Sequence, residues 1–347
     1  MSSYDDTMEL EAVISSTDSD NLASSRPDTR QAERHCADAI VFQGNKRISL
    51  RHLPLVQPET GDLIIDVLWT GISTGTERLL WASDMPPFPG LSYPLVPGYE
   101  AVGIVSDAPG DPDLVGQAVF VPGGHSFQDV ASVFGASARR LIVPVERAVV
   151  LDRQPCKEDV LLALAATAHH AVVADAPPEL IVGHGVLGRL MARITIALGH
   201  APPTVWEIDP NRQDGEGYMV MSPDVDTCSD YRAVCDVSGS VAAIDNIIAH
   251  CAKNACLVLA GFYSDRPSFA FPAAFMREMT LKIAAEWTPD DLAAVVALRE
   301  AGKLSLDGLV THTRRPEEAE TAYRTAFGDP ACLKMVLDWR GLHDDAH

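Results

Sequence analysis

A short apolar strand that runs directly into a glycine-rich turn constrains this chain more than any other feature. The strand is Leu180-Ile181-Val182, and a helical segment follows the turn. The turn consists of Gly183, His184, Gly185, Val186, Leu187 and Gly188. In a G-x-G-x-x-G of this kind the three glycines allow a tight turn, a close approach to a pyrophosphate and close helix packing. The order strand, turn, helix therefore predicts a dinucleotide site with its phosphates at a helix N-terminus.

Acidic residues follow about 20 positions later, at the end of the next predicted strand, 204–209. A carboxylate at this place accepts hydrogen bonds from the adenosine ribose. Glu207 is the first candidate and Asp209 the second. A carboxylate repels a 2′-phosphate, so NAD is favoured over NADP, although Arg212 lies near enough in sequence to leave NADP open. Ser238, Gly261 and Phe262 follow later strands on the same sheet edge and are further cofactor candidates.

Composition and residue pattern divide the chain into four parts. Residues 1–38 are acidic and rich in Ser, Asp and Thr, and are expected to be a disordered tail. Residues 39–151 show short β-like runs broken by Pro and Gly, which predicts an antiparallel, barrel-like unit. Residues 152–288 alternate helical and strand patterns, which predicts a doubly wound parallel sheet. Residues 289–347 form a C-terminal segment. Taken together, these parts predict an α/β protein.

Charge and hydropathy exclude several classes of partner. The formal charge of −21 repels phosphate backbones, so nucleic acid is not expected as a partner. No apolar run is long enough for a membrane span, and the acidic N-terminal stretch is unlike a secretion signal. The seven cysteines are scattered without a C-x-x-C. These features predict a cytoplasmic protein without an integral membrane segment.

The β-rich unit, the central glycine turn and the returning C-terminal segment together resemble the medium-chain dehydrogenase/reductase superfamily over about residues 39–340. The resemblance implies a GroES-like β-barrel catalytic domain joined to a Rossmann domain, with residues 289–347 returning to the catalytic domain. It also implies a homodimer, commonly formed through the edge of the Rossmann domain.

Zinc-binding members of the superfamily carry G-x-C-G-T-[DE] and P-G-H-E motifs, with a third ligand just before the Rossmann domain. Here Ser73 replaces the Cys and Tyr99 replaces the His, while 164–167 reads Leu-Ala-Ala-Thr. Glu100 alone remains, and a catalytic zinc needs about three protein ligands. We therefore expect no metal site. Thr167, on the helix that enters the Rossmann domain, is counted among the cofactor candidates.

Longer strings are similar to one branch of the superfamily, the dehydrogenases of hydroxyethyl bacteriochlorophyllide. They are 71–81, 85–100, 180–190, 284–287 and 332–339. That branch oxidises a 1-hydroxyethyl group on a bacteriochlorophyllide-type pigment to acetyl and passes the hydride to NAD. Two alternatives remain open at this point: a zinc-free, NADPH-dependent quinone or enone reductase, and a non-catalytic protein that binds NAD or pigment.

For the oxidation, Tyr99 and Ser73 occupy the positions of the zinc ligands, and their hydroxyls could relay the alcohol proton toward Glu100, Glu77 or solvent. A tyrosine relays a proton near neutral pH more readily than it accepts one, because its ordinary pKa is about 10. His169 and His170 are alternative bases.

Candidates for binding the pigment lie in two kinds of segment. Phe88 and Tyr93 belong to a stiff, proline-rich loop suited to a flat apolar ligand. Arg140, or alternatively Arg139 or Arg78, could meet the pigment carboxylate. His125 could ligate its magnesium.

Overall fold

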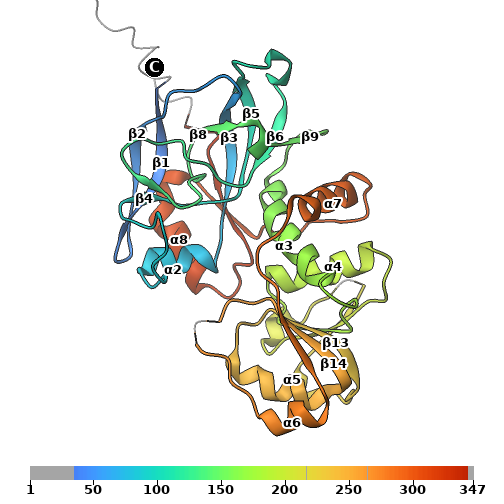
Figure 1. Ribbon diagram of the computed structural model, residues 1–347. Coiled ribbons are helices and arrows are strands. Elements are labelled where there is room, and N and C mark those ends of the chain that lie inside the picture. The colour runs from blue at the N-terminus through green and yellow to red at the C-terminus, as the bar shows by residue number, and fades with distance from the viewer. Residues whose placement is uncertain (1–34, 216, 264, 343–347) are drawn as a thin grey trace, which may run out of the picture. The chain divides into compact units, whose positions relative to one another are not determined.

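The computed structural model describes residues 35–342 except 216 and 264. Two sheets make up the β-rich unit (Figure 1). The smaller sheet has the strand order β2-β1-β4-β7, and the larger has the order β16-β17-β3-β5-β6-β9, with β8 paired to β3. The strands are β1 (Cys36–Gly44), β2 (Arg47–Pro54), β3 (Asp62–Ile72), β4 (Leu95–Val96), β5 (Ala101–Asp107), β6 (Ala118–Val121), β7 (Ala131–Ser132), β8 (Arg140–Pro144), β9 (Val149–Leu151), β16 (His312–Arg314) and β17 (Met335–Asp338).

Strand β3 illustrates why these segments form sheets. Its apolar residues alternate along the first half of the strand, so that Leu63, Ile65 and Val67 are buried while their neighbours are partly exposed. Successive side chains of a strand point to opposite faces, and this alternation fixes which face packs on the core. β3 pairs with β5, β8 and β17, all antiparallel, which makes it the central strand of the unit.

The dinucleotide half is a six-stranded sheet with the order β12-β11-β10-β13-β14-β15, and all of its pairings are parallel. Its strands are β10 (Leu180–Val182), β11 (Thr204–Trp206), β12 (Met219–Met221), β13 (Tyr231–Asp236), β14 (Cys251–Leu259) and β15 (Thr280–Ile283). Its helices include α3 (Leu162–Val172), α4 (Val186–Ala197), α5 (Ile244–His250) and α6 (Phe271–Met276). The parallel sheet and the antiparallel unit together are the fold class that the sequence predicts.

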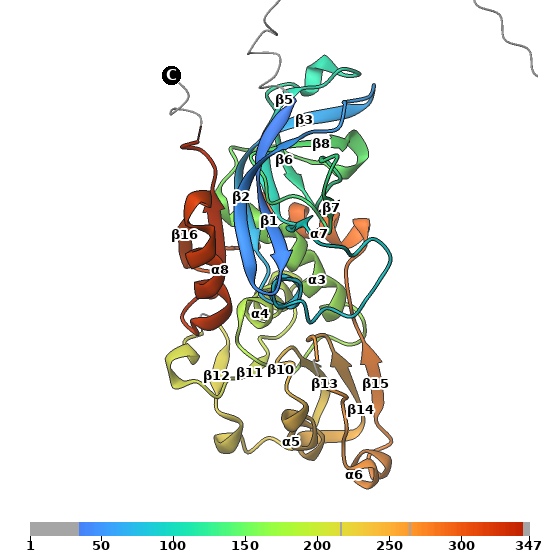
Figure 2. The ribbon, with the colours of Figure 1, turned by 90° about the vertical axis from the view of Figure 1, so that its left-hand side faces the viewer.

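The C-terminal segment contributes α7 (Pro289–Glu300), α8 (Ala319–Gly328) and strand β17. β17 pairs antiparallel with β3, from Met335 opposite Ile72 to Asp338 opposite Trp69. Figure 2 shows α8 beside β16 and β2, and these elements are in contact. The segment therefore completes the β-rich unit after the chain has passed through the parallel sheet.

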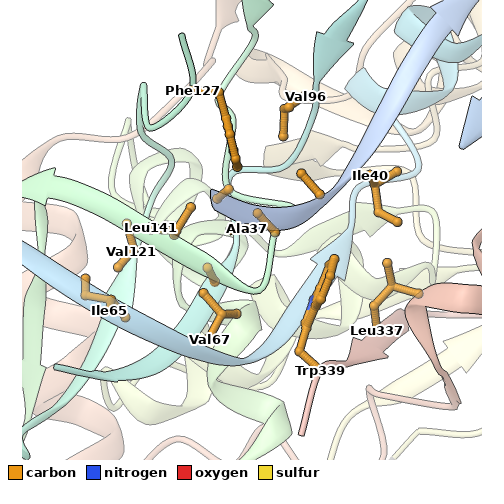
Figure 3. Close-up of a cluster of buried hydrophobic side chains, with 14 of the residues drawn as sticks. Ala37, Ile40, Ile65, Val67, Val96, Val121, Phe127, Leu141, Leu337 and Trp339 are labelled. Atoms are coloured by element: carbon orange, nitrogen blue, oxygen red, sulfur yellow. The ribbon is translucent and has the colours of Figure 1, made fainter. Parts of the chain in front are cut away.

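The core of the β-rich unit is formed from both of its sheets and from the C-terminal segment (Figure 3). Ile40 from β1, Ile65 from β3 and Leu337 from β17 are fully buried in it. Trp339 is also fully buried, and its indole Nε1 donates to Thr70 Oγ1 at 2.9 Å. A buried indole N–H needs such a partner, so Thr70 secures the orientation of the tryptophan.

The start of the ordered chain differs from expectation. β1 begins at Cys36, because Cys36, Ala37 and Asp38 pair with Pro54, Leu53 and His52 of β2. The sequence predicts these three residues as part of the disordered tail, which is wrong because their backbones pair with β2. The rest of the tail, residues 1–34, lies outside the described residues. Within the described part of the chain, no helix is both long and apolar enough to cross a bilayer.

Candidate active site

Ser73 and Tyr99 meet where two chain segments leave the β-rich sheets. Ser73 follows β3 and precedes the short helix α2 (Thr76–Ala82), and Tyr99 lies between β4 and β5. Their hydroxyl oxygens are 2.6 Å apart, a hydrogen bond in which either group can donate. Burial, together with the charge of Glu100, raises the pKa of the Tyr99 phenol well above its ordinary value. Tyr99 is therefore protonated at neutral pH and can relay a proton through Ser73.

Glu77, in the first turn of α2, is hydrogen-bonded to the backbone of Ser73. Its carboxylate accepts hydrogen bonds from the Ser73 backbone N–H at 3.0 Å and from the Tyr323 hydroxyl of α8 at 2.8 Å. Glu77 is fully buried, and burial raises the pKa of its carboxyl to about 7, although both hydrogen bonds lower it. A group with a pKa near neutrality can both accept and release a proton under ordinary conditions.

Glu100 forms a buried ion pair with Lys334, which precedes β17. Their side chains are 1% and 2% exposed, respectively. Burial raises the pKa of Glu100, and the ammonium of Lys334 opposes that rise. The pair packs against Gly71 of β3, where a Cβ atom would lie 2.1 Å from Glu100 Oε2. A side chain at position 71 would therefore displace the ion pair as it is packed here.

Sequence reasoning missed Lys334 and Tyr323, both of which contact the carboxylates. Tyr323 carries no local signal of its role, because its partner Glu77 is 246 residues away in the chain. Lys334 carries a weak one, since a lone cation interrupts the apolar run 332–337. A lysine is rarely buried without an anionic partner, and that rule could have singled it out.

The donor set at this site does not suit zinc. The two hydroxyls bond each other, Glu100 is held by an ammonium group, and Thr167 Oγ1 on α3 donates to the Ala163 carbonyl oxygen at 3.2 Å. Zinc sites in proteins use Cys, His and carboxylate ligands, about three of them in a catalytic site. Across residues 35–342, apart from 216 and 264, no group of three His, Cys, Asp or Glu side chains is placed to hold a metal ion.

The glycine turn adopts the geometry that its sequence predicts. A Cβ at Gly188 would lie 1.9 Å from the Gly183 carbonyl oxygen, and one at Gly183 would lie 3.1 Å from Ser238 Cα. Gly183 also has a φ of +102°, which glycine adopts without strain. Gly185 is the N-cap of α4, so the N-terminus of that helix begins at the turn. This arrangement suits the pyrophosphate of a dinucleotide.

Glu207 reaches back to the glycine turn from the end of β11. Its carboxylate accepts from the His184 backbone N–H at 3.2 Å and from the Asp209 N–H at 2.9 Å. Arg212 Nε lies 3.8 Å from the same carboxylate, and its guanidinium borders Gly185. Asp209 instead caps a 3-10 helix by accepting from the Asn211 N–H at 3.0 Å. Glu207 is thus the carboxylate that the structure brings to the turn.

His184 fastens the segment after β11 to the turn. Its ring contacts the Arg212 carbonyl oxygen at 2.6 Å through Nδ1 and the Tyr218 hydroxyl at 2.9 Å through Nε2. Gly261 and Ser238 lie near each other on the carboxyl edge of the sheet, because both backbone N–H groups bond Asp236. Phe262, the next residue, is 62% exposed on that edge.

The residues expected to bind pigment differ in their surroundings. Tyr93 donates its hydroxyl to the Leu80 carbonyl oxygen, and Arg140 is paired with Asp66 at 2.7 Å. Phe88 and His125 are exposed. The alternative bases His169 and His170 both bond the carboxylate of Asp291 on α7, at 2.7 and 2.9 Å, so they join α3 to α7.

The two parts of the site define the class of the protein: a dinucleotide-dependent oxidoreductase with the medium-chain dehydrogenase/reductase architecture. Solved structures agree in fold. The 2R,3R-butanediol dehydrogenase of Bacillus subtilis is 20% identical, with a TM-score of 0.76, over 87% of this chain and 99% of its own. The acetophenone reductase of Geotrichum candidum, solved with NAD, is 18% identical, with a TM-score of 0.74, over 88% and 98%.

Comparison of the sequence with known proteins identifies a family within this class of oxidoreductases. Two proteins named 2-desacetyl-2-hydroxyethyl bacteriochlorophyllide A dehydrogenase match 87% of this chain and 98% of their own lengths. The protein of Rhodobacter capsulatus is 50% identical over 306 residues, and that of Cereibacter sphaeroides is 49% identical over 311. No model in a scan of protein families matches the chain. The chain belongs to the family of these bacteriochlorophyllide dehydrogenases.

The buried carboxyl of Glu77 makes stability depend on pH. In the folded protein its pKa is about 7, above the ordinary value of 4.5, so the folded state binds the proton more tightly. The free energy of unfolding then falls as pH rises from about 4.5 to about 7, by about 3 kcal/mol in all. We predict that Glu77→Gln, which has no charge to bury, removes this fall and is the more stable protein at pH 8.

Urea unfolding at pH 5 and pH 8 measures this difference. Glu146→Gln, at an exposed carboxylate, is the matched control and is expected to retain the wild-type dependence on pH. Parallel pH profiles for wild type and Glu77→Gln would show that Glu77 does not titrate in this range.

Proposed function

We propose that this chain oxidises the hydroxyethyl group of 2-desacetyl-2-hydroxyethyl bacteriochlorophyllide a to an acetyl group, with NAD as the hydride acceptor and without zinc. The proposal is carried by sequence identity: dehydrogenases of that name are 49% and 50% identical to this chain over 98% of their own lengths. In this reaction the carbinol carbon loses a hydride, the hydroxyl loses a proton and a carbonyl group forms. Bound NAD supplies the hydride acceptor.

The hydroxyl pair is suited to the departure of the proton. Tyr99 and Ser73 hold each other at 2.6 Å, so a proton received by one can pass to the other. Glu77 positions Ser73 by accepting from its backbone N–H, and its carboxyl, with a pKa of about 7, is suited to take up the proton once the Ser73 hydroxyl releases it. Glu100 is engaged by Lys334 and serves to fix the loop that carries Tyr99.

A conjugated macrocycle lowers the need for a Lewis acid. Positive charge that develops on the carbinol carbon during hydride loss can spread into the ring system. Zinc-dependent relatives instead stabilise the alkoxide with the metal. The replacement of zinc ligands by Ser73 and Tyr99 is consistent with such a substrate.

Turnover is the direct test. Purified protein with the hydroxyethyl pigment and NAD is expected to form NADH and shift the visible spectrum of the pigment. The same rate is expected after treatment with a chelator, because no step is assigned to zinc. Absence of turnover would refute the proposed function, and a loss of activity that zinc restores would refute the metal-free reaction.

Tyr99→Phe removes one hydroxyl of the pair and keeps the ring. We predict a fall in kcat of about a hundredfold, the contribution of a well-placed proton-transfer group, with unchanged affinity for NAD. Steady-state kinetics and a titration with NAD measure the two quantities. An unchanged kcat would remove Tyr99 from the proton path.

NAD is proposed over NADP because Glu207 lies at the glycine turn, where the adenosine ribose would bind. Hydrogen bonds to a charged group are worth about 1.5–3 kcal/mol, so Glu207→Ala is expected to weaken NAD binding about ten- to a hundredfold. NADPH binding should weaken little, because its phosphate is repelled by the carboxylate in the wild type. Asp209→Asn, which keeps the helix cap, is the control. Equal losses for both cofactors would contradict this assignment.

We also propose a homodimer formed through β15. Within the described residues β15 ends the parallel sheet, and Ile283 on it is 83% exposed. Phe271, Phe275 and Met276 of the adjacent α6 are each more than 60% exposed. An unprotected edge strand beside exposed apolar side chains is typical of an interface, and a twofold axis lets two such edges pair.

The mass in solution tests the dimer. Light scattering is expected to give twice the chain mass for the wild type and the mass of one chain for Ile283→Lys. Met219→Lys, at an exposed apolar residue on the opposite edge strand β12, should remain dimeric. A monomeric wild type would contradict the proposal.

The compartment we propose is the cytoplasm. All seven cysteines lie in the described part of the chain and are free thiols. Free thiols in this number are usual in a reducing compartment.

A further inference from the structure

Phe134 has a backbone conformation that phenylalanine rarely adopts. Its φ is +67°, in the left-handed region, where a bulky side chain is a genuine outlier. The residue is nevertheless 43% exposed, so burial does not compensate for the strain. Strained residues that persist in folded proteins cluster at functional sites, where the surrounding structure enforces them.

Glycines allow the close backbone contact that holds this conformation: Gly135 follows Phe134, and Gly123 and Gly124 lie on the segment opposite. A Cβ at Gly123 would lie 2.6 Å from the Phe134 carbonyl oxygen, and a Cβ at Gly135 would lie 2.2 Å from the Gly124 carbonyl oxygen. The Gly124 N–H donates to that Phe134 oxygen. The two segments thus approach so closely that only glycine fits around Phe134. A glycine at 134 would be the unstrained choice, and yet the position carries an aromatic ring.

The same turn is attached to the loop that carries Tyr99. Val133 N–H donates to the Val96 carbonyl oxygen at 3.2 Å, Ala136 N–H to that of Gly98 at 2.8 Å, and Ser137 N–H to that of Pro97 at 2.8 Å. These three bonds hold the segment 133–137 against the residues just before Tyr99.

The rings of Phe134 and Tyr99 meet edge to face. Their centroids are 5.1 Å apart and their planes are inclined at 64°. The phenyl group therefore has a fixed position relative to the Tyr99 hydroxyl, while part of its surface stays open to a ligand.

We infer that Phe134 is a substrate-positioning residue that stacks on the flat conjugated ring of the substrate and sets the carbinol group at the Tyr99 and Ser73 hydroxyls. This inference rests on the proposed function, which supplies a flat aromatic substrate. An exposed aromatic ring in contact with the relay tyrosine offers such a macrocycle an apolar, planar contact without displacing any core residue.

Two variants and a control separate stacking from a structural role. Phe134→Gly relieves the left-handed strain, so its melting temperature should be no lower than that of the wild type. Its Kd and KM for the pigment should rise about three- to tenfold, the usual worth of an aromatic pair. Its affinity for NAD should stay unchanged. Phe134→Tyr, which keeps the ring, should bind pigment as the wild type does.

Asn254→Gly is the matched control, because Asn254 is also left-handed, with a φ of +59°, and lies on β14. It should leave pigment binding unchanged. Unchanged pigment Kd and KM in Phe134→Gly would overturn the inference, and so would a loss accompanied by a lower melting temperature and weaker NAD binding. Wild type that neither binds nor oxidises the pigment would instead refute the proposed function itself.

Discussion

The buried ion pair between Glu100 and Lys334 is the interaction on which the catalytic half of the site depends. Taking two charges out of water is costly, and the cost is offset only while both partners are present. The pair joins the loop before β5 to the segment before β17. It leaves no room for a side chain at Gly71 of β3. Tyr99 directly precedes Glu100, and Ser73 follows the same strand as Gly71, so this contact links the two segments that carry the hydroxyl pair.

The cofactor half could be predicted from the sequence because its signals are local. The glycine turn and Glu207 lie within 25 residues of each other, and Gly183 and Gly188 each have a steric reason that the structure shows. The fold class followed from the same kind of pattern. Strand β12, Met219–Met221, was not predicted, because three residues are too few for a periodic signal and, unlike the equally short β10, no motif adjoins it.

The catalytic half could be predicted only in part. Ser73, Tyr99, Glu77 and Glu100 stand in two short motifs, and the structure brings them together. Lys334 and Tyr323 are more than 200 residues away in sequence from their partners Glu100 and Glu77. A contact between residues so far apart has no sequence motif that would predict it. Pigment binding by Tyr93 and Arg140 stays a prediction; the structure shows that their polar atoms also have partners within the protein, at Leu80 and Asp66. Phe134 was missed because its conformation depends on glycine contacts across a turn.

The pairing of β17 with β3 has a consequence for the order in which the protein can be made. Lys334 and Trp339 follow the entire parallel sheet in the chain, yet they belong to the β-rich unit. While the ribosome is still producing the dinucleotide domain, that earlier unit exists with a buried carboxylate lacking its cation and a core lacking its indole. The β-rich unit therefore reaches its final packing only after the parallel sheet and the C-terminal segment have been synthesised, although its first strands are made before both.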